Sequence, residues 1–174
     1  MISISDFCDQ HRACKDGREW ALANCSDMPD AWEKLRPDWL IWIATRPGVL
    51  TDRELRLFAV FCARQVEHLL TDQRSRDAIS MAEKFAKGEA TTGELAAAWA
   101  LGAAAARAAA GVAARDAAWA AADASWAAAG VAARAAARAV ADAAWAAAGA
   151  AAGDAQSDWL RENTKPNFGV EVTS

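Results

Sequence analysis

The fold is decided by an alanine-rich repeat that reads GVAARDAAWAAADASWAAA at residues 111–129 and GVAARAAARAVADAAWAAA at residues 130–148. The two copies are identical at 15 of 19 positions, and a third glycine follows at Gly149. Alanine has the highest intrinsic helix propensity, because its side chain loses no conformational entropy when a helix forms. Proline is absent from residues 92–153. The repeat therefore predicts an all-α protein.

The alanine-rich helix can follow either of two courses. A capping box of Thr91 and Glu94 places its start near Thr92. An unbroken helix over residues 92–153 would be roughly 90 Å long at about 1.5 Å per residue. If the helix instead ends in a left-handed turn at each glycine, the repeat becomes a helical hairpin array whose Trp side chains share one core. No capping oxygen follows these glycines, so both courses stay open at Gly111, Gly130 and Gly149.

Both courses leave apolar surface for a partner helix. Alanine faces let two helices approach closely, and Trp supplies the large apolar area that alanine lacks. Val112, Trp119 and Trp126 lie at heptad spacing, which is typical of a seam between helices. The partner helix can belong to the same chain or to a second copy, and we expect a homo-oligomer formed through these helices.

The rest of the chain predicts three regions. Its 174 residues fit one domain or two small ones, and four of its nine Trp lie within residues 20–42. We divide the chain into a Trp-rich helical domain at 1–90, the alanine-rich helical repeat at 91–153, and a short helix with an extended tail at 154–174.

The Trp-rich region begins with short helices. We expect a helix that is capped by Ser5, extends through Cys14 and is broken at Gly17. Pro29 and Pro37 each lie where a proline opens the first turn of a further short helix.

Two amphipathic helices follow. Thr51 and Glu54 form a capping box at the start of the first one, whose apolar residues recur at three- and four-residue spacing. The second runs from about Arg74 to Lys87, and Gly88 is its expected C-terminal cap.

Charge and hydropathy exclude several classes of protein. The formal net charge of -4 argues against a general nucleic-acid binder, which needs a basic face. The N-terminus lacks a basic stretch followed by an apolar run, so we expect a cytoplasmic protein. We also expect no membrane span, because charged residues interrupt the alanine-rich stretch. These residues are Arg107, Arg115, Asp116, Asp123, Arg134, Arg138 and Asp142.

Four side chains near the N-terminus are of the types that bind zinc, namely Cys8, His11, Cys14 and Cys25. On one helix Cys8 and His11 would share a face, while Cys14 would be turned about 120° away. The spacing therefore supports a zinc site poorly. We interpret the thiols as small core residues and predict no metal, although the sequence alone leaves the question open.

The one constellation that could bind a ligand lies in the repeat. Phosphate-binding glycine loops and catalytic signatures are absent from the sequence, so we predict no cofactor and no catalytic residues. Arg guanidinium groups could pair with a phosphate while Trp rings stack on a planar base. The alternative is that these Trp residues fill a core and the Arg residues are solvated. The candidate residues are Arg115, Arg134, Arg138, Trp119, Trp126 and Trp145.

One longer run resembles a known group of proteins. It is TDRELRLFAVFCARQVEHLLTDQRSRDAISMAEKFAKGEATTGELAAA at residues 51–98, preceded by ACKDGREWA and RPDWLIWIA and followed by the alanine and Trp repeat. This arrangement, over roughly residues 13–150, resembles bacterial and phage proteins described as immunity proteins, similar to the fifth immunity family of polymorphic-toxin loci. The resemblance implies stoichiometric neutralisation of a toxin, or of a host defence by a phage-borne relative. It brings no active-site residues with it.

Three functions are compatible with these features. The first is a non-catalytic helical protein that neutralises a toxin or a host-defence protein by sequestering it. The second is a phage sponge that sequesters a small nucleotide immune signal on the Arg and Trp residues of the repeat. The third is an assembly element whose role is purely structural.

Overall fold

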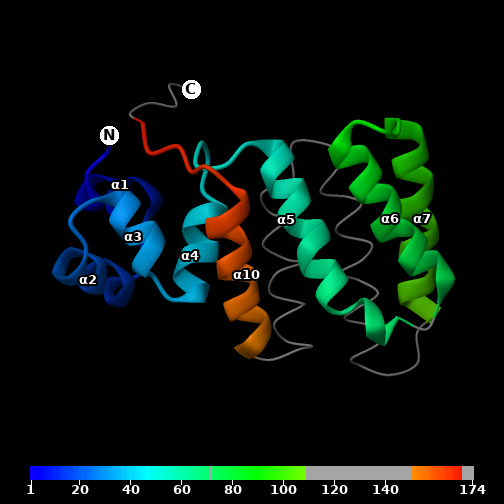
Figure 1. Ribbon diagram of the computed structural model, residues 1–174, viewed down its shortest axis with the longest axis horizontal. Helices are drawn as coiled ribbons and strands as arrows, with labels where there is room; N and C mark the ends of the chain where they lie inside the picture. Colours follow the sequence, from blue (N-terminus) through cyan, green and yellow to red (C-terminus); the bar gives the residue numbers. More distant parts are fainter. Residues whose placement is uncertain (71, 109–149, 170–174) are drawn as a thin grey trace.

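The computed structural model describes residues 1–70, 72–108 and 150–169. Within these residues the secondary structure is helical and contains no strand, which confirms the predicted all-α class (Figure 1). In chain order the elements are α1 (Ile4–His11), α2 (Lys15–Asn24), α3 (Met28–Lys34), α4 (Pro37–Ala44), α5 (Asp52–Gln65), the 3-10 turn η1 (Glu67–Leu69), α6 (Gln73–Lys87), α7 (Thr92–Ala108) and α10 (Ala150–Asn163). The course of the chain at Gly111, Gly130 and Gly149 lies outside the described residues.

The first two helices differ from the prediction. Ser3, and not Ser5, caps α1, because its hydroxyl accepts a hydrogen bond from the Asp6 amide at 3.1 Å. The helix ends at His11, since Arg12 adopts a left-handed conformation with φ 54°. Cys14 then becomes the N-cap of α2. The expected helix through Cys14 is therefore wrong.

Gly17 lies inside α2 and does not break it. A Cβ atom at this position would lie 3.1 Å from the Cys14 Sγ and 3.5 Å from the Trp39 ring. Glycine is thus explained by the close approach of neighbouring side chains and not by a turn. This requirement comes from tertiary packing, which a sequence pattern does not reveal.

The next helices follow their local signals. Pro29 and Pro37 lie in the first turns of α3 and α4, as predicted. Thr51 and Glu54 complete the expected capping box of α5, and Gly88 ends α6 in a left-handed conformation with φ 83°. These signals act between a side chain and its own backbone, so they are readable from sequence alone.

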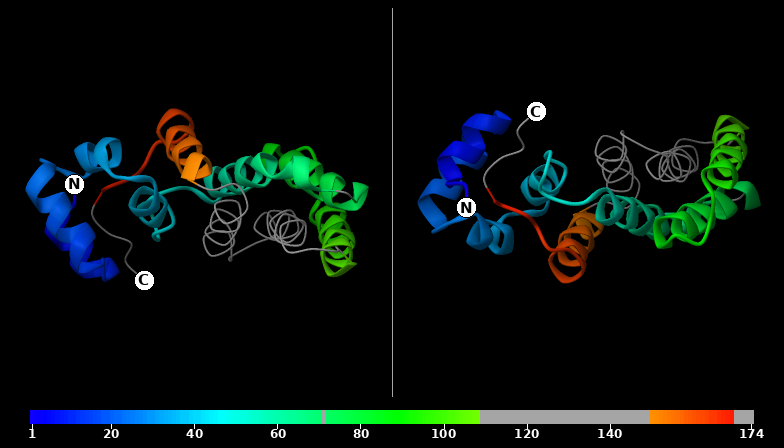
Figure 2. Two further views of the ribbon diagram at one scale, coloured as in Figure 1. Left: turned by 90° about the horizontal axis from the view of Figure 1, so that it is seen from below. Right: turned by 90° about the horizontal axis from the view of Figure 1, so that it is seen from above.

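Helix α5 lies at the centre of the described structure. Its Leu55, Phe58 and Cys62 are fully buried. Helix α6 packs against α5, α7 packs against α6, and α10 lies between α4 and α5 (Figure 1, with two further views in Figure 2). The residues before and after the alanine-rich repeat are thus part of one packed helical assembly.

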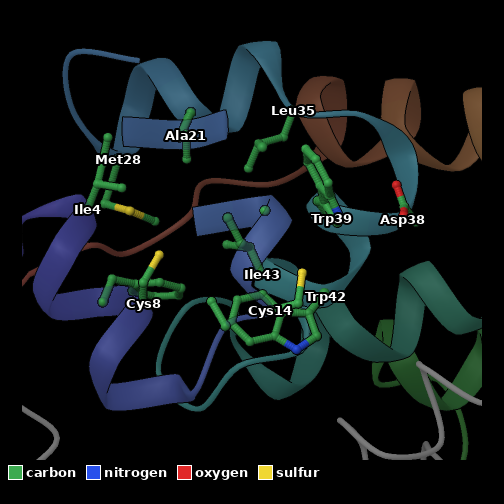
Figure 3. Close-up of a pocket in the computed structure, with 14 residues that line it drawn as sticks. Ile4, Cys8, Cys14, Ala21, Met28, Leu35, Asp38, Trp39, Trp42 and Ile43 are labelled. Atoms are coloured by element: carbon green, nitrogen blue, oxygen red, sulfur yellow. The ribbon is translucent and has the colours of Figure 1, made fainter. Parts of the chain in front are cut away.

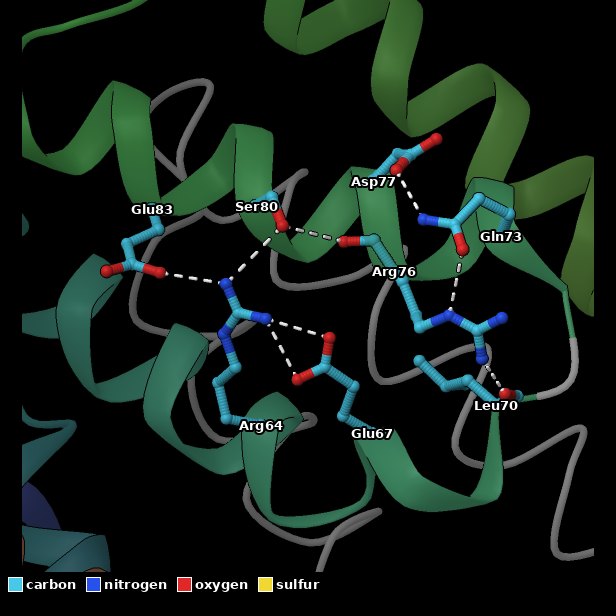
Figure 4. Close-up of polar contacts among 8 residues, drawn as sticks. All are labelled: Arg64, Glu67, Leu70, Gln73, Arg76, Asp77, Ser80 and Glu83. Carbon is cyan, nitrogen blue, oxygen red and sulfur yellow. Dashed lines mark hydrogen bonds and ion pairs between the residues drawn. The ribbon is translucent and has the colours of Figure 1, made fainter.

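A polar network joins α5, η1 and α6 (Figure 4). Arg64 donates to both carboxylate oxygens of Glu67 at 2.8 Å and to a carboxylate oxygen of Glu83 at 2.9 Å. Lys87 bonds the other oxygen of Glu83 at 2.6 Å. The Lys87 ammonium and the Arg64 guanidinium lower the pKa of Glu83, so this carboxylate stays charged in mildly acidic solution.

The C-terminal segment closes the structure back onto the N-terminus. Trp159 of α10 stacks on Phe61 with ring centroids 5.4 Å apart. Beyond α10 the extended segment 164–169 turns back, and the Ile2 amide donates to the Phe168 carbonyl at 2.9 Å. The Phe168 side chain is buried, so this segment belongs to the core and not to a loose tail.

None of the helices formed by the described residues is both long and apolar enough to cross a membrane.

Candidate binding site on the Trp-rich helices

The ligand site predicted in the repeat lies outside the described residues. This applies to all six of its members, Arg115, Arg134, Arg138, Trp119, Trp126 and Trp145. Helices α1 to α4 instead carry two features that can bind another molecule, an aromatic rim at the surface and a cavity behind it.

The aromatic rim consists of Trp20, Lys34, Arg36 and Trp39, which line a surface depression of about 230 Å³. Trp20 comes from α2 and Trp39 from α4, and their ring centroids are 6.0 Å apart with the planes tilted by 53°. The Arg36 guanidinium lies 4.5 Å above the Trp39 ring centroid, which is a cation–π contact. Both Trp side chains remain partly accessible to solvent.

Two carboxylates hold the cations of the rim in place. Arg36 bonds both oxygens of Asp38, at 2.5 and 2.6 Å, and Lys34 bonds Asp30 at 2.8 Å. These hydrogen bonds raise the pKa of both Arg36 and Lys34, so both stay charged at neutral pH. The side chains of Arg36 and Lys34 are still 62% and 51% exposed, so each can meet a further acidic or polar group.

A cavity of about 260 Å³ lies behind the Trp39 ring, is lined by residues of α1 to α4 and the turns between them, and opens to solvent on one side (Figure 3). Its walls are apolar side chains, with two thiols and one carboxylate among them. The lining residues are Ile4, Phe7, Cys8, Ala13, Cys14, Gly17, Ala21, Met28, Ala31, Leu35, Asp38, Trp39, Trp42 and Ile43.

The two thiols in the cavity differ in their access to solvent. Cys8 is buried, and burial raises the pKa of its thiol, so it stays neutral near pH 7. A neutral thiol is a poor nucleophile. Cys14 both lines the cavity and is exposed, so we place it at the mouth. The cavity is therefore suited to binding a ligand, and the reactivity of the exposed Cys14 thiol can report whether a ligand occupies the mouth.

The remaining zinc candidates lie elsewhere on these helices. His11 packs against Phe7, with ring centroids 4.5 Å apart, in a separate depression of about 440 Å³. Burial and the nearby Arg46 lower the pKa of His11. Cys25 lies near Asp30, and burial raises the pKa of its thiol. The described part of the chain holds no group of three or more His, Cys, Asp or Glu side chains placed to bind a metal ion.

The sequence gives partial signals for these two features. The concentration of Trp in residues 20–42 was visible, as was the proline that starts α4. The pairing of Trp20 with Trp39 could not be seen in the sequence, because it depends on the angle at which α2 packs near α4. Gly17 could have indicated the cavity, since a glycine within a helix lowers helix stability relative to alanine and therefore points to a constraint from packing.

Comparison with known proteins adds no relative: no protein-family model, no curated protein and no solved structure matches the chain. The resemblance to immunity proteins rests on the sequence runs quoted above.

Proposed function

We propose that this chain is a non-catalytic binding protein that neutralises a protein partner by sequestering it, in the manner of an immunity or anti-defence protein in the cytoplasm. The aromatic rim is the contact surface of this proposal. One observation carries it: Trp20 and Trp39 form an accessible ring pair, with the Arg36 guanidinium held over one ring. Trp and Arg are the residue types that dominate the binding energy of protein interfaces.

The rim also suggests what the partner contributes. A partly exposed indole pair offers a large rigid apolar area at little entropic cost, which suits an apolar anchor from the partner. Arg36 and Lys34 lie beside it with more than half of each side chain exposed. We therefore expect an acidic residue of the toxin or host-defence protein next to its anchor.

The test compares rim variants with a matched surface control. The double variant Trp20→Ala with Arg36→Ala should weaken binding to a co-encoded toxin or a host-defence protein by about 30-fold or more, which corresponds to a hot-spot loss of about 2 kcal/mol. Lys15→Ala with Glu19→Ala removes an exposed ion pair of the same helix α2 and should bind like the wild type. Thermal unfolding of each variant checks that the fold is kept.

Two results would overturn the proposal. One is a folded rim variant that binds and neutralises as well as the wild type. The other is a wild-type chain that forms no stable complex with any co-encoded toxin or host-defence protein.

The sponge and the assembly element are the alternatives that the repeat sequence favours. For a nucleotide sponge, replacing Arg115, Arg134 and Arg138 together should abolish ligand uptake without unfolding the chain. For an assembly element, deletion of one 19-residue copy should change the number of subunits in the homo-oligomer and little else. Native mass spectrometry of the purified protein reads both outcomes.

A further inference from the structure

The cavity behind Trp39 is a solvent-accessible hollow with mainly apolar walls. Small-molecule sites in proteins are concave and lined mostly by hydrophobic and aromatic side chains. An apolar cavity of about 150 Å³ is enough to hold benzene. The cavity between α1 and α4 measures about 260 Å³, so it has room for one or two fused rings.

The walls of this cavity select for an uncharged aromatic molecule. Phe7, Trp39 and Trp42 contribute rings, and the sulfurs of Cys8 and Met28 can contact the edge of a bound ring. Asp38 is the charged residue in the lining. Arg36 bonds both oxygens of Asp38 and lowers its pKa, so this carboxylate is ionised and already paired. Among the described residues, the lining contains no cationic side chain that could pair with an anionic ligand, and burying an unpaired charge is costly.

Small residues on α2 keep the space open. Gly17 and Ala21 lie one helical turn apart and both line the cavity. A single Cβ atom at Gly17 would already lie 3.1 Å from the Cys14 Sγ and 3.5 Å from the Trp39 ring. Larger side chains at these two positions would fill the space, so the cavity follows from specific residue choices on one helix face.

We propose that the cavity lined by α1 to α4 is a binding site for a small, flat, uncharged aromatic molecule of one or two rings. The ligand enters beside Cys14, lies against Trp39 and Trp42, and excludes water from the sulfur-lined interior. The site shares the Trp39 side chain with the rim, but it does not presuppose the proposed protein-binding function.

The first experiment titrates the full-length protein with indole in a calorimeter. Indole should bind saturably with about one molecule per chain, whereas indole-3-carboxylate should not bind, because the described lining residues offer no cation to pair with its carboxylate. Ala21→Leu, which fills the cavity, should weaken indole binding by at least about tenfold. Ala23→Leu adds the same atoms at an exposed position of α2 and should leave the affinity unchanged.

A second experiment needs no variant and covers the case in which Ala21→Leu does not fold. Iodoacetamide alkylates accessible thiols, and peptide mass spectrometry follows Cys14 and Cys25 in one sample. Saturating indole should slow alkylation of Cys14 severalfold and leave Cys25 unchanged, because Cys25 is not among the lining residues.

The proposal is wrong if indole gives no saturable binding to the wild-type protein, or if a folded Ala21→Leu variant binds it with unchanged affinity. Equal alkylation of Cys14 with and without bound indole would also overturn the placement of the ligand. Each of these results leaves the test of the aromatic rim unaffected, since that test measures a protein complex.

Discussion

Phe168 provides the sharpest test of how the C-terminal segment is held. Its side chain is 6% exposed, although it lies in an extended stretch close to the end of the chain. Its ring lies 6.0 Å from the Trp32 ring and 6.3 Å from the Phe7 ring, both in edge-on arrangements. Backbone hydrogen bonds also hold the segment, from the Ile2 amide to the Phe168 carbonyl at 2.9 Å and from the Asn167 amide to the Val49 carbonyl at 2.8 Å. The substitution Phe168→Ala removes the buried ring and keeps the backbone hydrogen bonds, so it separates the contributions of the two to stability.

The expected cost follows from burial and ring contacts. Burying a Phe side chain stabilises a fold by about 1.5–3 kcal/mol, and each aromatic pair adds about 0.5–1.5 kcal/mol. Core Phe→Ala substitutions cost about 3–5 kcal/mol, and a segment near the chain end can relax into part of the lost volume. We therefore expect Phe168→Ala to lower the free energy of unfolding by about 3 kcal/mol. For a chain of this length that corresponds to a fall in Tm of about 6–12 °C.

Urea unfolding followed by Trp fluorescence measures this change, because Trp32 contacts the substituted ring. Asn167→Ala is the matched control: the Asn167 side chain is exposed and accepts one hydrogen bond, from the Gly169 amide at 2.9 Å. It should change the free energy of unfolding by less than about 0.5 kcal/mol. A loss below about 1 kcal/mol for Phe168→Ala would refute the reasoning, because the backbone hydrogen bonds would then hold the segment without the ring.

Four further predictions concern local features of the fold, and urea unfolding checks each of them. Gly88→Ala should cost about 1 kcal/mol, because Gly88 has φ 83° and has no atom within 4 Å of an added Cβ, so the cost is conformational alone. Gly93→Ala should instead stabilise the protein by about 0.5 kcal/mol, since Gly93 lies in α7 without a positive φ, and equal effects at both positions would contradict this account. Thr51→Ala removes the hydroxyl that caps α5 and should cost about 1 kcal/mol, whereas Thr51→Ser should restore most of the stability. The pKa of Glu83 is lower in the folded than in the unfolded chain, so ionisation of Glu83 stabilises the fold. This stabilisation is complete above about pH 4.3, the ordinary pKa of Glu, and is lost as the pH falls from there through the lowered pKa of the folded state. Glu83→Gln should therefore flatten that part of the plot of stability against pH, and an unchanged plot would contradict the lowered pKa.

Local chemistry accounts for the parts of the fold that could be predicted. The capping box at Thr51 and the left-handed Gly88 were predictable, because each depends on contacts between residues at most a few positions apart. Gly17 shows the limit of this approach. In isolation it resembles a helix breaker, yet it lies inside α2, where the close approach of Cys14 and Trp39 leaves little room for a side chain. Trp39 is distant in sequence, so no local pattern contains that constraint.

The site and the C-terminal segment were less predictable for the same reason. The tail after α10 has neither helical nor strand periodicity, so the sequence predicts only an extended end. Phe168 is buried because it meets residues from the opposite end of the chain, Trp32 and Phe7. Arg161 of α10 likewise bonds the carbonyl of Leu35 at 2.7 Å, far from it in sequence. A lone aromatic residue in a polar tail was the available signal.

The aromatic rim and the cavity share the Trp39 ring, so the two proposed binding events are not independent. The Trp39 ring centroid lies 6.0 Å from the Trp20 ring centroid, and Trp39 also lines the cavity. A ligand that fixes the orientation of Trp39 reduces the conformational entropy of this side chain before a protein partner binds. The partner then loses less entropy on binding, which raises its affinity. Such coupling is reciprocal, because a ligand that raises the affinity for a partner is itself bound more tightly in the complex, by the same factor. Ala21→Leu fills the cavity, so it should remove the effect of indole on partner affinity while leaving the rim residues in place.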